Sequence, residues 1–132
     1  MKTVWVTSRF EGWHHWPDAF EEVAYLRDRH RHEFHVRAEV PVDHANRSIE
    51  FITLKRQVVR FVAEAWPGGE LGARSCEMVA EAIGRAIVRE YGCAWARVDV
   101  SEDGENGGSC IVSIGEVTDA DPALLINILG RE

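Results

Sequence analysis

The clearest pattern of apolar and polar positions alternates with a period of two over residues 30–41. Even positions from 34 to 40 are apolar, and odd positions from 31 to 39 are charged or polar. Such alternation is typical of a strand with one buried face and one solvated face. Residues 3–10 alternate in the same way, so the pattern predicts a second strand near the N-terminus.

Two segments in the middle of the chain switch to helical spacing. Apolar residues recur every three or four positions in residues 52–65 and again in residues 75–91, which predicts two amphipathic helices. Ser75 suits the N-cap of the second helix, and Gly92 suits a left-handed C-terminal cap. A shorter helix is expected after Pro17, which fits a first helical turn.

The remaining segments complete an α+β pattern. "DHANRS" predicts a turn, and the "IEFI" that follows it predicts the start of a return strand. Residues 93–102 and 109–115 predict two strands joined by the turn "DGENGG", and residues 119–130 predict a final helix or an extended cover. We expect one domain over residues 1–132, with a four-stranded antiparallel sheet and two long helices on one face, in the order ββααββ.

Composition narrows the functional classes. A chain of 132 residues with 45% hydrophobic and 28% charged residues fits one globular domain. The net charge of −7 argues against a nucleic-acid partner. The sequence has no apolar run of 18 or more residues, so it predicts no membrane span. The N-terminal segment "MKTVWVTSRF" lacks the apolar core of a signal peptide. We therefore expect a cytoplasmic protein. Cys76, Cys93 and Cys110 show no paired spacing and are expected to be buried free thiols.

Histidines supply the candidate chemistry. His30 and His32 share one strand face about 6.5–7 Å apart, so both rings can reach an ion bound at about 2.0–2.1 Å. If the first two strands are neighbours, His14 in the loop "WHHWP" provides a third ligand, and three histidines with an open fourth position are typical of catalytic zinc. His35 faces the other side and His44 lies in the distal turn, so neither is included. A solvated, histidine-rich strand end remains the alternative.

Several segments together resemble a known family. "FEGWHHWP", "RHRHEFHVRAEV", "IEFITLK", "SCEMVAEAI" and "VDVSEDGENGG" are similar, in order and spacing, to the 6-pyruvoyl-tetrahydropterin synthase / 6-carboxytetrahydropterin synthase family across most of residues 3–112. The resemblance implies the tunnelling T-fold. It implies Zn²⁺ bound by His14, His30 and His32, and substrate contacts from Glu102, Ser75 and Cys76.

Glu102 also suits a ligand contact on chemical grounds. It ends a predicted strand on the same face as Val98 and Val100. A carboxylate there can accept two parallel hydrogen bonds from an amidine-like N–H pair, as a pterin or guanine edge presents. An exposed glutamate before a turn is the alternative.

The sequence departs from the family at its catalytic positions. Leu26 stands where the resemblance implies a cysteine, and a leucine cannot act as a base. The family's Asp-His pair after the first long helix has no counterpart, since Asp43 and His44 come too early. The catalytic residues therefore stay unassigned.

Three functions remain compatible with the sequence. The first is a zinc-dependent lyase acting on dihydroneopterin triphosphate or a related reduced pterin, in a 7-deazaguanine (queuosine-type) or pterin pathway. The second is a non-catalytic T-fold protein that binds a pterin or purine, and the third is a small α+β domain with incidental histidines. Free sheet edges need cover, so a trimer-based homo-oligomer is expected, with a hexamer as the larger alternative.

Overall fold

The computed structural model describes residues 1–124, so the expected terminal helix or cover over residues 119–130 lies largely outside the described residues. The described chain contains long strands, two long helices, one short strand and several short 3-10 segments. In order, the elements are β1 (Lys2–His14), η1 (Glu21–Arg27), β2 (His30–Val42), α1 (Phe51–Ala65), η2 (Pro67–Gly69), β3 (Glu70–Gly72), α2 (Cys76–Tyr91), β4 (Trp95–Glu102), β5 (Asn106–Ser113) and η3 (Ile114–Glu116).

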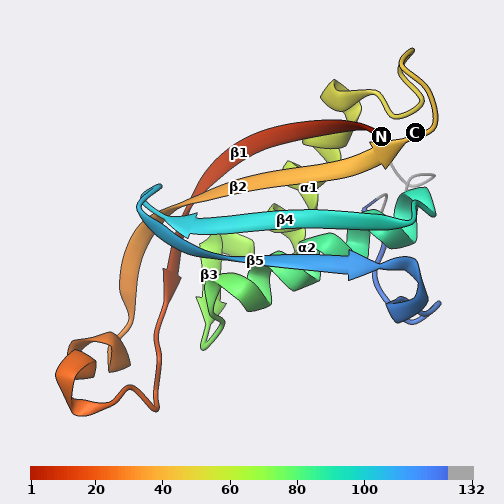
Figure 1. The fold of residues 1–132 in the computed structure, drawn as a ribbon. Coiled ribbons are helices and arrows are strands. Elements are labelled where there is room, and N and C mark those ends of the chain that lie inside the picture. Colours follow the sequence, from red (N-terminus) through yellow and green to blue (C-terminus); the bar gives the residue numbers. More distant parts are fainter. Residues whose placement is uncertain (125–132) are drawn as a thin grey trace.

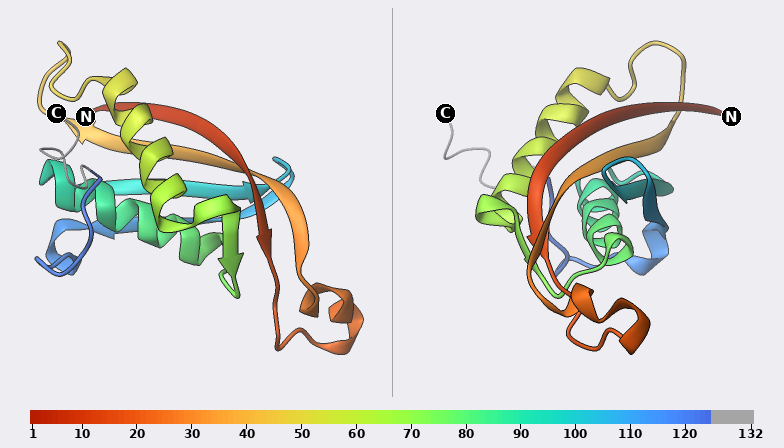
Figure 2. Two further views of the ribbon diagram at one scale, coloured as in Figure 1. Left: turned by 180° about the vertical axis from the view of Figure 1, so that it is seen from behind. Right: turned by 90° about the vertical axis from the view of Figure 1, so that its left-hand side faces the viewer.

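The strands form one curled sheet in the order β3-β1-β2-β4-β5 (Figures 1 and 2). The four long strands pair antiparallel, and the short β3 adds a fifth strand parallel to the end of β1. The sequence did not predict β3. Gly69 explains how it reaches β1, because a Cβ at this positive-φ residue would lie 2.2 Å from the backbone oxygen of Glu11. Only glycine permits that approach.

Both long helices pack against the same face of the sheet, as the left-hand view of Figure 2 shows. The even-numbered residues of β2 face them, as the period-two pattern predicts. The helices bury the apolar stripes that their spacing predicts. Fully buried large side chains from these elements include Phe34, Val40, Leu54, Val58, Val79, Ile83, Ile87, Val98 and Val100.

The return strand expected from "IEFI" is absent from the structure, which has the start of α1 at this point. Residues 49–52 do not continue the sheet, because α1 begins at Phe51. Glu50 is its N-cap, and the carboxylate accepts hydrogen bonds from the backbone N–H of Ile52 (2.6 Å) and Thr53 (2.9 Å). A carboxylate that caps free N–H groups at a helix N-terminus is stabilised by the helix dipole. The side chain of Glu50 therefore favours the helix over a strand at this point.

The second helix has the ends that the sequence predicts. Ser75 Oγ accepts a hydrogen bond from Met78 N (3.2 Å), and Gly92 adopts a left-handed conformation with φ of 60°. Within residues 1–124, no helix is long and apolar enough to cross a membrane. All three cysteines are free; Cys76 is buried, while Cys93 and Cys110 are partly buried.

Tyr91 joins the two helices and gives the fold a pH dependence. Its hydroxyl donates to Gln57 Oε1 (2.8 Å), and burial raises the pKa of Tyr91 to about 12. An unfolded tyrosine ionises near pH 10, so stability present below pH 10 should be lost as the pH rises toward 12. Urea unfolding at increasing pH checks this, with Tyr91→Phe expected to flatten the alkaline slope.

The ionisation itself can be observed separately. The chain has two tyrosines, and the other, Tyr25, is 71% exposed. In a Tyr25→Phe variant, tyrosinate absorbance should therefore report Tyr91 alone and rise only near pH 12 or on unfolding. A normal titration near pH 10 in the folded protein would contradict the role of burial.

Candidate metal centre

The side chains of the site continue the buried face of the sheet beyond its apolar core. β2 pairs with β1 so that His30 lies opposite His14 and Phe34 opposite Phe10, while β4 places Glu102 opposite Phe34. The even-numbered series of β2 thus passes from apolar residues to Phe34 and then to two histidines. The sequence predicted this pair on one face, but it placed His14 in a loop. In the structure His14 is the last residue of β1.

Three histidines and one carboxylate meet at this end of the sheet. His14, His30, His32 and Glu102 each offer one ligand atom, and these atoms all lie within 4.8 Å of one another. The ring centroids of the histidines are 4.6–5.6 Å apart. A metal bound at about 2.0–2.2 Å draws its ligand atoms to within about 4.4 Å, so small side-chain rotations complete such a site. The cluster can hold a metal ion.

The hydrogen bonds of the histidines fix which ring nitrogen faces the centre. His14 Nδ1 lies 3.0 Å from Arg74 O, and His30 Nδ1 lies 2.8 Å from Asp28 O. His32 Nδ1 lies 2.8 Å from Asp103 Oδ2. Carbonyl and carboxylate oxygens only accept hydrogen bonds, so each Nδ1 must carry the proton and donate it. Each Nε2 is left with its lone pair, as in histidines that bind metals.

These lone pairs face a carboxylate rather than a hydrogen-bond donor. His14 Nε2 lies 2.9 Å from Glu102 Oε2, and His32 Nε2 lies 3.4 Å from Glu102 Oε1. His32 Nε2 is moreover buried without a hydrogen-bond partner. Acceptor atoms at such separations repel unless a cation lies between them or the rings are protonated. The residues present therefore fit a bound cation.

Burial argues for a metal over a proton at His14. The side chain is buried, and this desolvation lowers its pKa below the ordinary value of 6.5, while the charges of His30 and His32 lower it further. The bond to Arg74 O and the charge of Glu102 act in the opposite direction but do not reverse the shift. A neutral imidazole is the form that binds metals.

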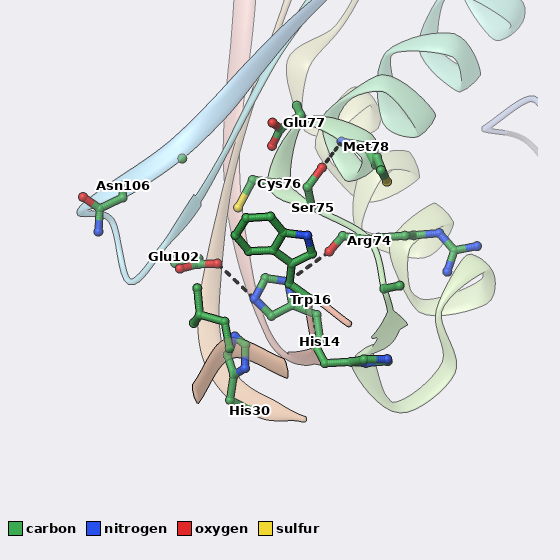
Figure 3. Close-up of a pocket in the computed structure, with 14 residues that line it drawn as sticks. His14, Trp16, His30, Arg74, Ser75, Cys76, Glu77, Met78, Glu102 and Asn106 are labelled. Atoms are coloured by element: carbon green, nitrogen blue, oxygen red, sulfur yellow. Dashed lines mark hydrogen bonds and ion pairs between the residues drawn. The ribbon is translucent and has the colours of Figure 1, made fainter. Parts of the chain in front are cut away.

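A cavity of about 500 Å³ opens beside the candidate metal cluster (Figure 3). Its volume lies within the usual range of small-molecule sites, about 300–1,000 Å³. The wall combines three of the four candidate ligands, His14, His30 and Glu102, with residues from the β1–β2 connection, the start of α2 and the start of β5. Lining residues are His14, His15, Trp16, Leu26, His30, Ala73, Arg74, Ser75, Cys76, Glu77, Met78, Glu102, Asn106 and Gly107.

All three residues expected to contact a substrate line this cavity, from two different elements: the N-terminus of α2 and the end of β4. Ser75 and Cys76 both line it at the N-terminus of α2, and Figure 3 shows the Cys76 sulfur directed toward the space in front of Glu102. Burial, with added repulsion from Glu102 and Glu77, raises the pKa of the Cys76 thiol to about 12. The thiol is therefore neutral at neutral pH. Glu102 lines the cavity too, but its oxygens also face His14 and His32.

Sequence reasoning missed several residues of the site. Trp16, Glu77 and Asn106 line the cavity, and Asp103 holds His32, yet none was selected from the sequence. Asp103 directly follows Glu102 in the turn before β5, and this position was the available signal. The two bonds that Asp103 accepts, from His32 first and then from Glu33 N, lower the pKa of its carboxyl group. The excluded His35 and His44 lie outside the cluster.

No protein-family model matches the chain. No curated protein sequence matches it either.

Proposed function

We propose that the protein is a zinc-dependent T-fold protein of the tetrahydropterin-synthase type, acting on a reduced pterin. The observation that carries this proposal is the arrangement of three histidine Nε2 atoms and a carboxylate around one point, with each Nδ1 hydrogen-bonded. Imidazole and carboxylate ligands suit zinc, although other divalent metals also accept them. The order of the long elements, β1, β2, α1, α2, β4 and β5, supports the resemblance noted in the sequence.

The cavity beside the metal centre supports a planar heterocyclic ligand. Trp16 offers an aromatic wall, and the hydroxyl of Ser75 can still donate while its oxygen caps α2. Two carboxylates, Glu77 and Glu102, line the cavity and can accept the N–H groups of a pterin or purine. Because Glu102 also faces the histidines, it lies at the junction between ligand and metal.

The side chains at this site can hold a metal ion and bind a ligand, but they include no evident general base. A bound zinc ion would act as a Lewis acid toward a hydroxyl or carbonyl oxygen of the ligand. His14, His30 and His32 would hold the ion, and Glu102 would balance its charge. Leu26 and Trp16 contribute apolar surface to the wall of the cavity. Cys76 stays protonated and can donate a weak hydrogen bond, but it is a poor base.

Leu26 favours a second candidate function, binding without turnover. It lines the cavity at the position where the resemblance implies a catalytic cysteine. Arg74 is the one Lys or Arg among the lining residues, and its Nη1 donates to Leu71 O (3.0 Å). A triphosphate normally requires several cationic or N–H donors. These features fit a dephosphorylated pterin or a purine better than a triphosphate.

The homo-oligomer expected from the sequence is part of the proposal. β5 forms one edge of the sheet, and β1 pairs with β3 only at Trp13 and His14 within the described residues. Long unpaired strand edges are favourable places for a second copy of the chain. We therefore propose assembly through these edges.

One set of measurements on the purified protein tests the proposal. Metal analysis should find about one zinc per chain. Incubation with dihydroneopterin triphosphate or dihydroneopterin, followed by chromatography, should show a new pterin product. If the protein only binds, 7,8-dihydropterin or guanine should raise the Tm without turnover. Sedimentation equilibrium of the same sample should show an oligomer.

Each outcome has a distinct meaning. Zinc with turnover supports the enzyme, and zinc with a ligand-dependent Tm but no product supports the binding protein. A protein that neither binds zinc nor responds to any of these heterocycles contradicts both. A His35→Ala variant should give the same zinc content and ligand response as the wild type, because His35 lies on the opposite face of β2 and contacts Glu33 (3.1 Å).

A further inference from the structure

Asp103 occupies a backbone conformation that most residues avoid. It lies in the turn between β4 and β5 and has φ of 57°, one of two non-glycine residues with positive φ in the described chain. Aspartate tolerates the left-handed region better than most residues, but the conformation still costs about 1 kcal/mol or more. Such a conformation persists only where surrounding contacts require it, and strained residues of this kind cluster at functional sites.

The contacts of Asp103 latch its turn onto β2. Its backbone N–H donates to Glu33 O (2.7 Å), and its Oδ1 accepts from Glu33 N (3.0 Å). Its Oδ2 accepts from His32 Nδ1 (2.8 Å). Both carboxylate oxygens and the backbone N–H are thus committed to two consecutive residues of β2. The side chain is held in place although it is 48% exposed.

Of the three histidines, only His32 relies on a side chain to hold its Nδ1 proton. His14 and His30 donate to backbone carbonyls of Arg74 and Asp28, which any residue there would supply. His32 alone of the three donates to a side chain. A carboxylate acceptor fixes the tautomer, orients the ring and raises the basicity of the other nitrogen. That other nitrogen, His32 Nε2, is the buried atom without a hydrogen-bond partner.

We infer that Asp103 is a positioning residue of the metal centre, which keeps the proton of His32 on Nδ1 and directs Nε2 at the metal. This inference rests on the proposed metal site. It assigns to Asp103 no contact with metal or substrate, only control of one ligand. The residue's unusual backbone conformation places both carboxylate oxygens where the two bonds require them.

Asp103→Asn tests the inference with almost no change of shape. Asparagine also tolerates positive φ, and its Oδ1 can still accept from Glu33 N. Its NH₂ group would then face His32 Nδ1, which favours the tautomer with the proton on Nε2 and blocks the metal lone pair. If the Asn amide is flipped, its NH₂ group faces the backbone N–H of Glu33, and two donors cannot form a hydrogen bond. One of the two contacts is therefore lost in either orientation.

Two measurements follow this change. Zinc affinity, measured by competition with a chromophoric chelator, should fall about 10–100-fold in Asp103→Asn. Nitrogen-15 NMR of the imidazoles in the metal-free protein should show His32 protonated on Nδ1 in the wild type and shifted toward Nε2 in the variant. Glu105→Gln is the matched control, because it removes an exposed carboxylate from the same turn and should leave both readouts near the wild-type values.

The results separate this inference from the proposed function. If the wild type binds no zinc, the metal proposal falls, yet the NMR comparison still tests whether Asp103 fixes the His32 tautomer. Zinc affinity and tautomer both unchanged in Asp103→Asn would overturn the inference. If Asp103→Asn fails to fold, Asp103→Gly keeps the positive φ and removes the carboxylate, and it should show the same loss of zinc affinity.

Discussion

Replacing His30 by alanine is expected to remove the metal from the protein while leaving the fold intact. His30 is one of three candidate imidazole ligands, and its side chain is partly exposed at the start of β2, outside the apolar core. Loss of one ligand from a three-histidine site should weaken zinc binding by more than the roughly 10–100-fold produced by changing an outer partner. Metal analysis after dialysis should fall from about one zinc per chain to nearly none.

His35→Ala and His44→Ala are the controls for this result. Both remove an imidazole from the same chain, and neither residue belongs to the cluster. Circular dichroism should show the same secondary structure for all three variants. If His30→Ala retained stoichiometric zinc, or if His35→Ala lost it equally, the metal would be bound elsewhere.

The part of the site that the sequence predicted depends on local periodicity. A period of two fixes that His30 and His32 share a face with Phe34 and Val36, and the structure places them so. The same reasoning predicted the face and both ends of α2. These features depend on nearest neighbours in the chain, so the order of residue types was sufficient.

The remaining features depend on contacts between distant segments. The length of β1 follows from its full pairing with β2 through His14 and His30, and the sequence "WHH" alone gives no sign of it. β3 exists because Gly69 lets its segment approach β1. The Nδ1 partners Arg74 and Asp103 lie 60 and 71 residues from the histidines that they orient. No local pattern could assign those tautomers.

The surroundings of Glu102 combine a locally predicted position with contacts that local patterns do not predict. Its position on the inner face at the end of β4 was readable from Val98 and Val100. Its closeness to His14 and His32 depends on β2 lying between β1 and β4, which only the sheet order supplies. The sequence therefore predicted a ligand anchor, and the structure adds a second possible role as a metal ligand.

Phe34→Ala should have the largest effect on stability, because Phe34 joins the core to the metal centre. Its ring is fully buried, stacks on Phe10 at 5.4 Å, and meets the rings of His14 and His32 edge-on at 5.1 Å and 5.8 Å. Removing a buried phenylalanine side chain costs about 3–5 kcal/mol, the sum of lost burial and the remaining cavity. Urea unfolding of the metal-free protein should show this loss.

The same substitution should weaken zinc binding, although Phe34 offers no ligand atom. The cavity left by its ring lets His14 and His32 adopt other rotamers, so part of the binding free energy is spent on ordering them. Phe20→Ala is the matched control, because Phe20 is 55% exposed and its loss should cost well under 1 kcal/mol. Unchanged zinc affinity in a folded Phe34→Ala protein would mean that the hydrogen bonds to Arg74 and Asp103 hold the two rings without support from the core.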